Sequence, residues 1–498
     1  MSPIDRRIYD HPVLSFHRGK RVRFYFEDKI VEAYEGESIA VALHAIGVDV
    51  FSWSPVLRRP RGPFCMIGKC SSCFMTVNGY PNSKTCRIPV RDGLRVERQK
   101  GWGLLADLNN SSESIEVEEL NPDILVIGGG PAGLEAALTA STYGLDVVLV
   151  DEHFKLGGQL LKQTHKFFGN VELFGGMRGF QIAEKYAEKI GKSSNIKTLL
   201  NTVAYGVFRE GIIGAVSENK HYVIKPRAVI IASGAQEKFL DFPNNDLPGV
   251  IGAGGAQTLM NEFGVKPGEE ALVVGSGNVG LIISYQLLQS WIKVKGVVEV
   301  MSEIGGWFVH AAKIRRYGIP IYVKHTLKHV EGEQRVSKAV IAAVDEKLNF
   351  IPGTEKEFSV DLVLLAVGLE PDTRLHAQAG ATMKYTPELG GLVPVRTLDL
   401  ETTVENMYLA GDSSGIEEAT TAILEGRIAA LSIASKLCDS SKAVKARETM
   451  ENTLKFLWDE YRSSPLLLRA RKGKEKATVT PEELEHLRRI HPPPVSFR

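Results

Sequence analysis

An α/β fold with two Rossmann-like domains is what the 498-residue sequence predicts, and an internal duplication predicts it. At residues 123–152 and again at 270–299, an apolar run enters a glycine-rich turn, passes through a helical stretch, and leads to a second apolar run that ends in an acid. That order of segments is a complete β-α-β unit. In both copies the acid stands six positions before a Gly-Gly pair. The chain therefore contains two copies of one nucleotide-binding unit.

Three glycines of the first unit have different mechanical tasks. Gly128 makes the tight turn, Gly130 lets the backbone approach a pyrophosphate, and Gly133 lets the helix pack against the strand. Asp151 follows Gly128 by 23 positions and is placed to hydrogen-bond a ribose hydroxyl pair. A glycine-rich turn without a ligand would fit a lone motif, but here strand, helix, second strand and acid all agree. We predict a bound dinucleotide.

The composition excludes several classes of protein. The length suggests roughly two to four domains. With 60 basic and 59 acidic residues the formal net charge is +1, so no global field indicates nucleic acid or an anionic membrane as partner. No segment approaches the ~18 apolar residues of a membrane-spanning helix, and no apolar stretch follows the first residues. We therefore expect a soluble, cytoplasmic protein.

Two short strands and a helix are predicted near the beginning of the chain. The strands alternate at residues 22–26 and 30–34. The helix covers about residues 38–46, with Ser38 as its N-cap. Residues 99–121, which contain a run of Asn, Ser and Glu, are expected to be a linker.

Four of the five cysteines fall in one segment, with the spacing Cys65-x4-Cys70-x2-Cys73-x12-Cys86. Such clustering in a reducing compartment indicates metal ligands rather than disulfides. The first three cysteines have the spacing of the plant-type [2Fe-2S] loop. Zinc is the main alternative and a redox dithiol the second, but zinc usually takes paired C-x2-C knuckles and only one exists here. We predict a [2Fe-2S] cluster held by all four thiolates.

An Ala-Gly-Asp sequence ends an apolar strand at residues 407–412 and precedes a long helix over about residues 417–434. It resembles the second FAD signature of two-dinucleotide flavoproteins such as glutathione reductase and its relatives. The resemblance implies that Asp412 hydrogen-bonds the ribityl chain. It also implies that the positive end of the helix dipole faces the flavin pyrimidine, where it would stabilise the reduced, anionic flavin. A helix-capping aspartate in an ordinary turn is the alternative. We predict that this motif and the first unit bind FAD.

A Gly-Gly turn follows the first unit and leads to Gln159. In disulfide reductases of this general architecture a cysteine follows such a pair and exchanges electrons with the flavin. No Cys-x-x-Cys occurs between Cys86 and Cys438 either. The flavin therefore has no protein disulfide with which to exchange electrons.

The second unit repeats the pattern with Gly275, Gly277, Gly280 and Glu299. If it binds a nicotinamide nucleotide, NAD(H) is favoured over NADP(H), because the Glu299 carboxylate would repel a 2′-phosphate and no arginine follows it directly. A Rossmann domain kept as a scaffold is the alternative.

The Arg-Pro-Arg-Gly sequence at residues 59–62, together with the cysteine segment, is similar to the [2Fe-2S] β-grasp domain of one family of amine-oxidising complexes. The chain resembles, over about residues 10–435, the α subunits of the sarcosine oxidase, hydrogen cyanide synthase, opine oxidase and dye-linked L-proline dehydrogenase family. The resemblance implies a hetero-oligomer in which a separate flavin-containing β subunit oxidises an amine or imino acid. L-Proline or sarcosine-like secondary amines are the first candidates, and small ferredoxin-like subunits are possible partners. It also implies that the second nucleotide site can hold NAD(H) or ATP.

The fold class is thus a glutathione reductase-like pair of Rossmann-like domains with an N-terminal ferredoxin-like domain and a helical C-terminal tail. The predicted limits are 1–105 for the [2Fe-2S] domain, 120–245 with 355–438 for the FAD domain, 246–354 for the NAD(P)-type domain and 439–498 for the tail. The basic stretch 469–476 is expected to be a solvated face or a subunit contact.

Two sets of residues are predicted to bind nucleotides, and none is predicted to be catalytic. The FAD set is Gly128, Gly130, Pro131, Ala132, Gly133, Asp151, Glu152, Gly158, Gln159, Ala232, Gly234, Gly411 and Asp412. The second set is Gly275, Gly277, Asn278, Gly280 and Glu299.

The predicted function is electron transfer between FAD and the cluster within a heteromeric amine or imino-acid dehydrogenase. A self-sufficient NADH-dependent reductase that feeds an acceptor protein is one alternative. A mainly structural nucleotide-binding subunit is the other.

Overall fold

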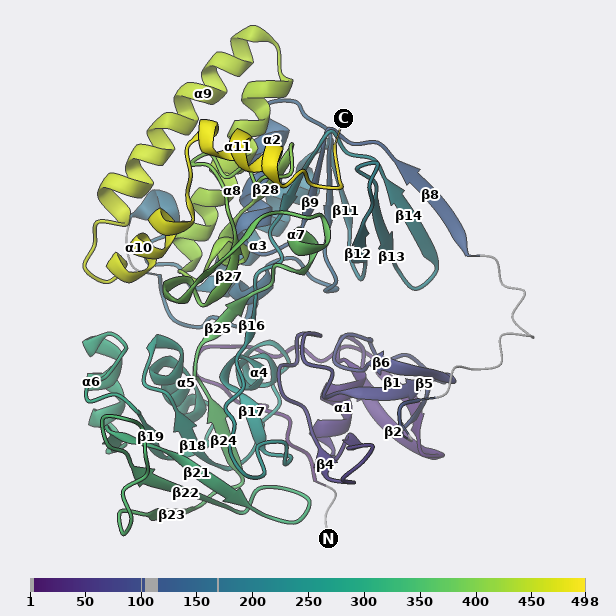
Figure 1. Ribbon diagram of the computed structural model, residues 1–498. Helices are drawn as coiled ribbons and strands as arrows, with labels where there is room; N and C mark the ends of the chain where they lie inside the picture. Colours follow the sequence, from purple (N-terminus) through teal and green to yellow (C-terminus); the bar gives the residue numbers. More distant parts are fainter. Residues whose placement is uncertain (1–3, 100, 104–114, 168–169, 498) are drawn as a thin grey trace. The chain divides into compact units, whose positions relative to one another are not determined.

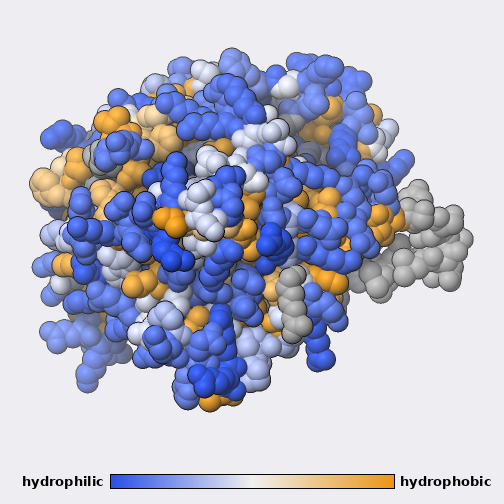
Figure 2. Space-filling view, turned by 90° about the horizontal axis from the view of Figure 1, so that it is seen from above, coloured by the Kyte–Doolittle hydropathy of each residue, from blue (hydrophilic) through white to orange (hydrophobic). Residues whose placement is uncertain are grey.

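The protein is represented by a computed structural model (Figure 1), which describes residues 4–99, 101–103, 115–167 and 170–497. No helix in these ranges is long and apolar enough to cross a membrane. On the face seen in Figure 2, hydrophilic residues predominate and hydrophobic residues occur in small groups.

The chain divides into two compact units. The first comprises Met1–Ser111 and Glu237–Gly368, and the second comprises Ser112–Gln236 and Leu369–Arg498. The cysteine segment and the second glycine-rich unit therefore belong to the first compact unit. The first glycine-rich unit, the Ala-Gly-Asp motif and the tail belong to the second.

The N-terminal part of the first unit is a five-stranded mixed sheet with the order β2-β1-β7-β5-β6. Its strands are β1 (Arg21–Phe26), β2 (Lys29–Tyr34), β5 (Phe74–Val77), β6 (Tyr80–Lys84) and β7 (Arg95–Glu97). The predicted hairpin is confirmed, because β1 and β2 pair in antiparallel fashion. Helix α1 (Ile39–Ala45) is also confirmed, since the Ser38 hydroxyl accepts a hydrogen bond from Val41 N at 3.3 Å. A short hairpin of β3 (Ser52–Trp53) and β4 (Pro60–Arg61) precedes the cysteines.

The rest of the first unit is built on a parallel sheet with the order β17-β24-β18-β19-β20. Its strands are β17 (Val250–Gly252), β18 (Glu270–Val274), β19 (Lys293–Val298), β20 (Ile321–Tyr322) and β24 (Leu362–Leu365). The other elements are α4 (Ala253–Gln257), the π-helical turn η4 (Thr258–Glu262), α5 (Asn278–Gln289), α6 (Phe308–Arg316), and the antiparallel strands β21 (His325–Glu331), β22 (Lys338–Ala343) and β23 (Lys356–Ser359). Strand β24 lies between β17 and β18, and all three are apolar, largely buried runs, as is usual in parallel sheets. The predicted domain limits stay a prediction.

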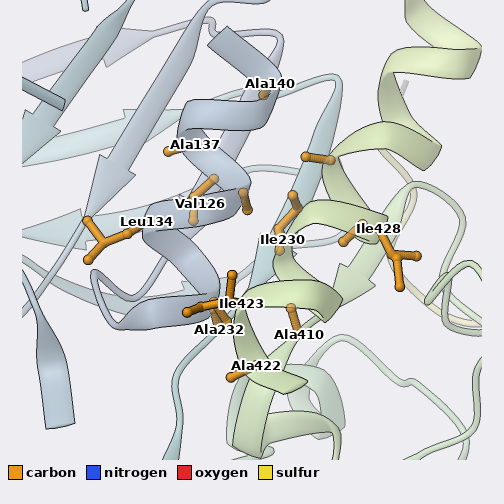
Figure 3. Packing of buried hydrophobic residues seen from close by; sticks show 14 of the residues in the cluster. Val126, Leu134, Ala137, Ala140, Ile230, Ala232, Ala410, Ala422, Ile423 and Ile428 are labelled. Carbon is orange, nitrogen blue, oxygen red and sulfur yellow. The ribbon is translucent and has the colours of Figure 1, made fainter. Parts of the chain in front are cut away.

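The second unit is built on a parallel sheet with the order β11-β10-β9-β15-β28. Its strands are β9 (Ile124–Ile127), β10 (Val147–Val150), β11 (Ile196–Leu199), β15 (Ala228–Ile231) and β28 (Met407–Leu409). Its helical elements are α2 (Pro131–Thr142), η2 (Gly158–Lys162), η3 (Val171–Leu173), α3 (Gly179–Lys192), η6 (Gly411–Ser414) and α8 (Ala419–Leu437). The Ala-rich helix α2 packs beside α8 in one cluster of buried hydrophobic residues (Figure 3). The approach is close, since a Cβ on Gly426 would lie 2.0 Å from the carbonyl oxygen of Ala132.

Part of the predicted linker is a strand instead. Strand β8 (Glu116–Leu120) pairs in parallel with β14 (Lys220–Ile224), about a hundred residues further along the chain. This pair belongs to a four-stranded sheet with β13 (Ile213–Val216) and β12 (Val203–Val207). The prediction was wrong at these residues because distant pairing, rather than local sequence, decides the strand. Most of the remaining linker, residues 100 and 104–114, lies outside the described residues.

Shorter elements complete the second unit. They are β16 (Ala235–Glu237) paired with β25 (Leu369–Pro371), α7 (Arg374–Gln378), β26 (Met383–Thr386), η5 (Pro387–Leu389) and β27 (Gly391–Pro394).

The C-terminal tail is helical, as predicted. It consists of α9 (Ser440–Lys455), the π-helical turn η7 (Phe456–Tyr461), α10 (Leu468–Ala477) and α11 (Pro481–Ile490). The Thr480–Glu483 capping box is present, with Pro481 at the first helical position. The expectation that residues 469–476 form a solvated face is wrong for Lys474, whose side chain is only 2% exposed and pairs with buried acids.

Candidate cofactor-binding sites

Four strands of the second compact unit end at one edge of its parallel sheet. Because β9, β10, β15 and β28 all run parallel, their carboxyl ends share that edge. Gly128 follows β9, Asp151 follows β10, Ala232 follows β15, and Gly411 lies just beyond β28. The residues predicted to bind FAD thus gather where open α/β sheets bind their ligands.

The glycines of the first turn differ in what surrounds them. A Cβ on Gly128 would lie 2.2 Å from the Ala232 carbonyl oxygen, and one on Gly133 would lie 1.8 Å from the Gly128 carbonyl oxygen. Both positions are therefore closed by backbone. A Cβ on Gly130 would have no atom within 4 Å. Because Gly130 stands at the N-terminal end of α2, free space lies where a helix start binds a pyrophosphate.

Asp151 supports the glycine-rich turn through its carboxylate. Its Oδ2 accepts a hydrogen bond from Gly129 N, and its Oδ1 accepts one from His153 N at 2.6 Å. Asp151 and the neighbouring Glu152 are both half-buried. The acid at the end of β10 is thus held against the turn, at the position where the fold binds a ribose.

The Gly-Gly turn packs on the glycine-rich turn itself. Gly157 N donates to the Gly129 carbonyl oxygen at 2.8 Å, and a Cβ on Gly158 would lie 2.8 Å from the Cα of Gly130. Gln159 follows in η2 with an exposed side chain. At the end of β15, Gly234 has a φ of +72° and open space at its Cβ position.

Asp412 lies in η6, between β28 and α8. Its Oδ1 accepts a hydrogen bond from Glu417 N at 3.4 Å, and no described residue donates to its Oδ2. Although the side chain keeps some solvent contact, burial raises the pKa of Asp412 to about 6. A half-buried carboxylate with one oxygen that no described residue contacts, at the carboxyl end of the sheet, fits a ligand hydroxyl.

The three glycines of the second glycine-rich turn have nearly the same surroundings as those of the first. A Cβ on Gly275 would lie 2.3 Å from the Ala366 carbonyl oxygen, and one on Gly280 would lie 2.0 Å from the Gly275 carbonyl oxygen. A Cβ on Gly277 would have no atom within 4 Å. The second glycine-rich turn therefore keeps the free space for a pyrophosphate, and side chains do not fill that space.

Glu299 takes the place of Asp151 in the second glycine-rich unit. Its Oε2 accepts hydrogen bonds from Ser276 N at 2.9 Å and from the Ser276 hydroxyl at 2.6 Å, and its Oε1 accepts one from Met301 N at 2.9 Å. Asn278, also predicted to bind the nucleotide, accepts a hydrogen bond from Trp307 N through its Oδ1. Asn278 therefore anchors the segment that follows the second Gly-Gly pair.

The four clustered cysteines form two pairs. The Cys65 and Cys70 thiols hydrogen-bond each other, which raises the pKa of Cys65 and lowers that of Cys70 to about 7. The same interaction between Cys73 and Cys86 lowers the pKa of Cys73 and raises that of Cys86. No three His, Cys, Asp or Glu side chains of the described residues converge as a mononuclear metal site would need. Two pairs suit a centre with two irons and four thiolate ligands better than one tetrahedral zinc.

The cysteine segment is packed into the nucleotide-binding part of the same compact unit. The Phe64 ring stacks on Phe239 at 4.3 Å between centroids, and Gly252 N donates to the Phe64 carbonyl oxygen at 3.3 Å. A Cβ on Gly255 would lie 2.0 Å from that same oxygen. Sequence reasoning missed Gly255, although its place just after an apolar strand was a usable signal. The missing side chain of Gly255 thus leaves room for the backbone that leads into Cys65.

Two family models match the chain. The pyridine nucleotide-disulphide oxidoreductase model matches residues 122–426, which is more than half of the chain. The 2Fe-2S iron-sulfur cluster binding domain model matches residues 19–101, which contain all four clustered cysteines.

Two curated relatives belong to oxidases of several subunits. The alpha subunit of sarcosine oxidase from Corynebacterium sp. (strain U-96) is 25% identical over 434 residues, which cover 82% of this chain and 43% of that protein. An opine oxidase subunit from Agrobacterium tumefaciens (strain Ach5) is 27% identical over 350 residues, 65% of this chain and 69% of that protein. The chain thus spans less than half the length of its sarcosine oxidase relative.

A solved structure, L-proline dehydrogenase from P. horikoshii, matches with a TM-score of 0.65 and 29% identity over 91% of this chain and 79% of that one. Its likeness extends over both compact units. The two glycine-rich turns and the paired cysteines agree with these matches. The chain is a flavin-dependent oxidoreductase with a [2Fe-2S] domain, and it belongs to the pyridine nucleotide-disulphide oxidoreductase family.

Proposed function

We propose that the chain is the electron-transfer α subunit of a heteromeric amine or imino-acid dehydrogenase. Its FAD and its [2Fe-2S] cluster exchange electrons, while a separate β subunit with its own flavin oxidises the substrate. The observation that carries the proposal is the pairing of a disulfide reductase fold that has no redox disulfide with four clustered thiols in the same chain.

The chemistry of the two cofactors supports this assignment. A bound flavin can take up an electron pair and release single electrons, and an iron-sulfur cluster is an electron carrier. The usual disulfide partner of the fold is absent, since Gln159 stands in its place and no cysteine occurs between Cys86 and Cys438. The cluster is then the acceptor or donor available within the chain.

The relatives suggest the partners and the substrate. Two are named as subunits of sarcosine oxidase and opine oxidase, and the structural relative is an L-proline dehydrogenase. We propose secondary amines of this kind, L-proline or sarcosine-like, as substrates of the assembled complex. We also place the complex in the cytoplasm, where reducing conditions keep the cluster thiols from forming disulfides.

The isolated chain should not oxidise such an amine. With L-proline or sarcosine and a dye as acceptor, we expect at most background turnover from the chain alone and full turnover when a flavin-containing β subunit is added. We expect this because the proposal assigns amine oxidation to the flavin of the β subunit, and no residue of this chain is predicted to be catalytic. Full-rate amine oxidation by the chain alone would contradict its assignment to a larger complex.

A second candidate function is an NADH-dependent reductase, because the space for a pyrophosphate beside Gly277 is as open as the space beside Gly130. Anaerobic addition of NADH to the pure chain separates the two. Rapid bleaching of the flavin absorption, at a rate that supports turnover with an acceptor protein, favours the reductase. Slow or absent bleaching favours the role within a dehydrogenase complex, with the second site holding a nucleotide such as ATP that transfers no hydride.

NADH should bind the second site at least about tenfold more tightly than NADPH, which corresponds to ~1.4 kcal/mol. The reason is the Glu299 carboxylate, which is buried at the end of β19 and would face a 2′-phosphate. Calorimetric titration of the chain with each nucleotide measures the ratio. Glu299→Gln should reduce the ratio of NADH affinity to NADPH affinity. The matched control is Glu303→Gln, because Glu303 is exposed. Tighter binding of NADPH would refute this role of Glu299.

A further inference from the structure

A buried carboxylate, Glu425, supports the turn that carries Asp412. The Oε2 of Glu425 accepts hydrogen bonds from Gly411 N at 2.9 Å and from the Ser414 hydroxyl at 2.5 Å. These two residues are the first and last of η6, so one side chain of α8 holds both ends of the turn. Only 1% of the Glu425 side chain is exposed. The geometry of η6 therefore depends on the position and charge of this carboxylate.

The other oxygen of Glu425 is held by two cations from the C-terminal tail. Its Oε1 accepts hydrogen bonds from Arg462 at 2.6 Å and from Lys474 Nζ at 2.7 Å. Both cations are only 2% exposed. Lys474 Nζ also donates to the Ser414 hydroxyl, and Arg462 also pairs with Glu417. The tail thus reaches the turn directly, at Ser414, as well as through Glu425.

The packing of α10 explains how Lys474 comes to lie there. A Cβ on Gly473 would lie 2.6 Å from the Leu389 side chain, so the helix approaches η5 closely at that residue. Leu389, Val393 and Ala477 form a small buried cluster around the contact. The backbone of Arg396 is also joined to α10, because its N–H donates to the Ala477 carbonyl oxygen at 3.2 Å. Lys474, one residue after Gly473, therefore faces the interior.

The charge of Glu425 depends on its two cationic partners. Burial alone would raise the pKa of Glu425, but Lys474 and Arg462 lower it to about 2, so the carboxylate stays ionised throughout the physiological range. An ionised group that is buried and loses a partner is costly to keep in place, and it relaxes by moving or by taking up a proton. Either change alters the acceptor that faces Gly411 N and the Ser414 hydroxyl.

We propose that Lys474 and Arg462 are positioning residues for FAD: by holding Glu425 they hold the turn Gly411–Ser414, and with it Asp412, in the geometry that binds the flavin. The proposal rests on FAD being bound at this turn, as the proposed function has it. It gives the charged tail a task in cofactor binding. The positive charges of Lys474 and Arg462 are then explained by this role, without a solvated surface or a contact with another protein.

The test compares Lys474→Met with Lys472→Met in the full chain. Methionine keeps most of the length of the unbranched side chain and removes its charge, and Lys472 is an exposed residue of the same helix. After the flavin has been removed, FAD is titrated back at low temperature and its binding is followed by flavin fluorescence. We expect the dissociation constant to rise at least about tenfold for Lys474→Met and to stay unchanged for Lys472→Met. Iron content should be the same in both.

A second variant, Glu425→Gln, guards against a folding defect. It keeps the size of the side chain and an oxygen that can accept from Gly411 N, but it removes the charge that Lys474 and Arg462 neutralise. We expect weakened FAD binding here too. Because Lys474 has no carboxylate of Glu425 to hold in this background, adding Lys474→Met should weaken FAD binding less than it does in the wild type.

Three outcomes decide the matter. Weakened FAD binding in folded Lys474→Met and Glu425→Gln supports the proposal. A lower melting temperature with an unchanged FAD dissociation constant would show a merely structural role and overturn it, while the proposed function would stand. A wild-type chain that binds no FAD would overturn the proposed function and this inference with it.

Discussion

Gly130→Val should purify without FAD, with an affinity reduced at least about a hundredfold, which corresponds to ~2.7 kcal/mol. A Cβ at this position meets no atom within 4 Å, so the protein leaves room for the start of a side chain, and we expect the valine methyl groups to take the space of the pyrophosphate. The backbone tolerates the change as well, because Gly130 has a φ of −80° and extended geometry. We therefore expect Gly130→Val to fold and to lose FAD binding only. Absorption spectra and flavin extraction measure it.

The duplicated turn supplies the matched control. Gly277→Val makes the same change in the second glycine-rich unit, where φ is −63° and the Cβ position is equally open. It should keep FAD and lose binding of NAD(H) or another adenine nucleotide. Gly128 is unsuitable for this purpose, since a side chain there would strike the Ala232 carbonyl oxygen. Stoichiometric FAD in purified Gly130→Val would show that the first glycine-rich turn has been misread.

Cys73→Ser should lose the [2Fe-2S] cluster and keep FAD. Cys73 is paired with Cys86 inside the protein, and loss of one thiolate leaves an iron with an incomplete set of ligands. FAD is expected to remain because its residues belong to the other compact unit. Iron and sulfide analysis of anaerobically purified protein, together with visible circular dichroism, measures the change.

Cys438→Ser is the control for this second prediction. Cys438 caps the C-terminal end of α8, and its Sγ contacts the Tyr143 carbonyl oxygen at 3.9 Å, far along the chain from the cluster segment. The replacement should leave iron and flavin unchanged. If the wild-type chain contained zinc and no iron, the cluster assignment would fail. If Cys73→Ser kept a full complement of iron, Cys73 would not be a ligand.

Local sequence signals were reliable where a short segment decides its own structure. The hairpin of β1 and β2, the Ser38 cap of α1 and the capping box at Thr480 all formed as predicted. Each depends on groups within a few residues of one another, so a single sequence contains the whole interaction. Spacing was equally informative for the cluster, because the cysteine segment matches the model of 2Fe-2S domains.

Long-range contacts were beyond local reasoning. Glu116–Leu120 is polar enough to suggest a linker, yet it is a strand because β14 offers it a partner. Lys474 lies in a basic stretch that suggests a solvent-exposed face, yet it is buried because Glu417 and Glu425 pair with it. In both cases the decisive partner is tens of residues away or more.

The sequence by itself determined the cofactor chemistry of this protein: two glycine-rich turns with their terminal acids, an Ala-Gly-Asp motif, and four cysteines in cluster spacing. These signals are local, because binding a pyrophosphate or an iron requires particular residues at short, fixed separations. Only the tertiary structure decided that the cysteine segment packs on α4 through Gly255, and that tail cations support the turn at Asp412. Those arrangements bring together residues that are 37 to nearly 200 positions apart. They follow from the need to bury apolar surface and neutralise charge across the whole fold, which no local pattern records.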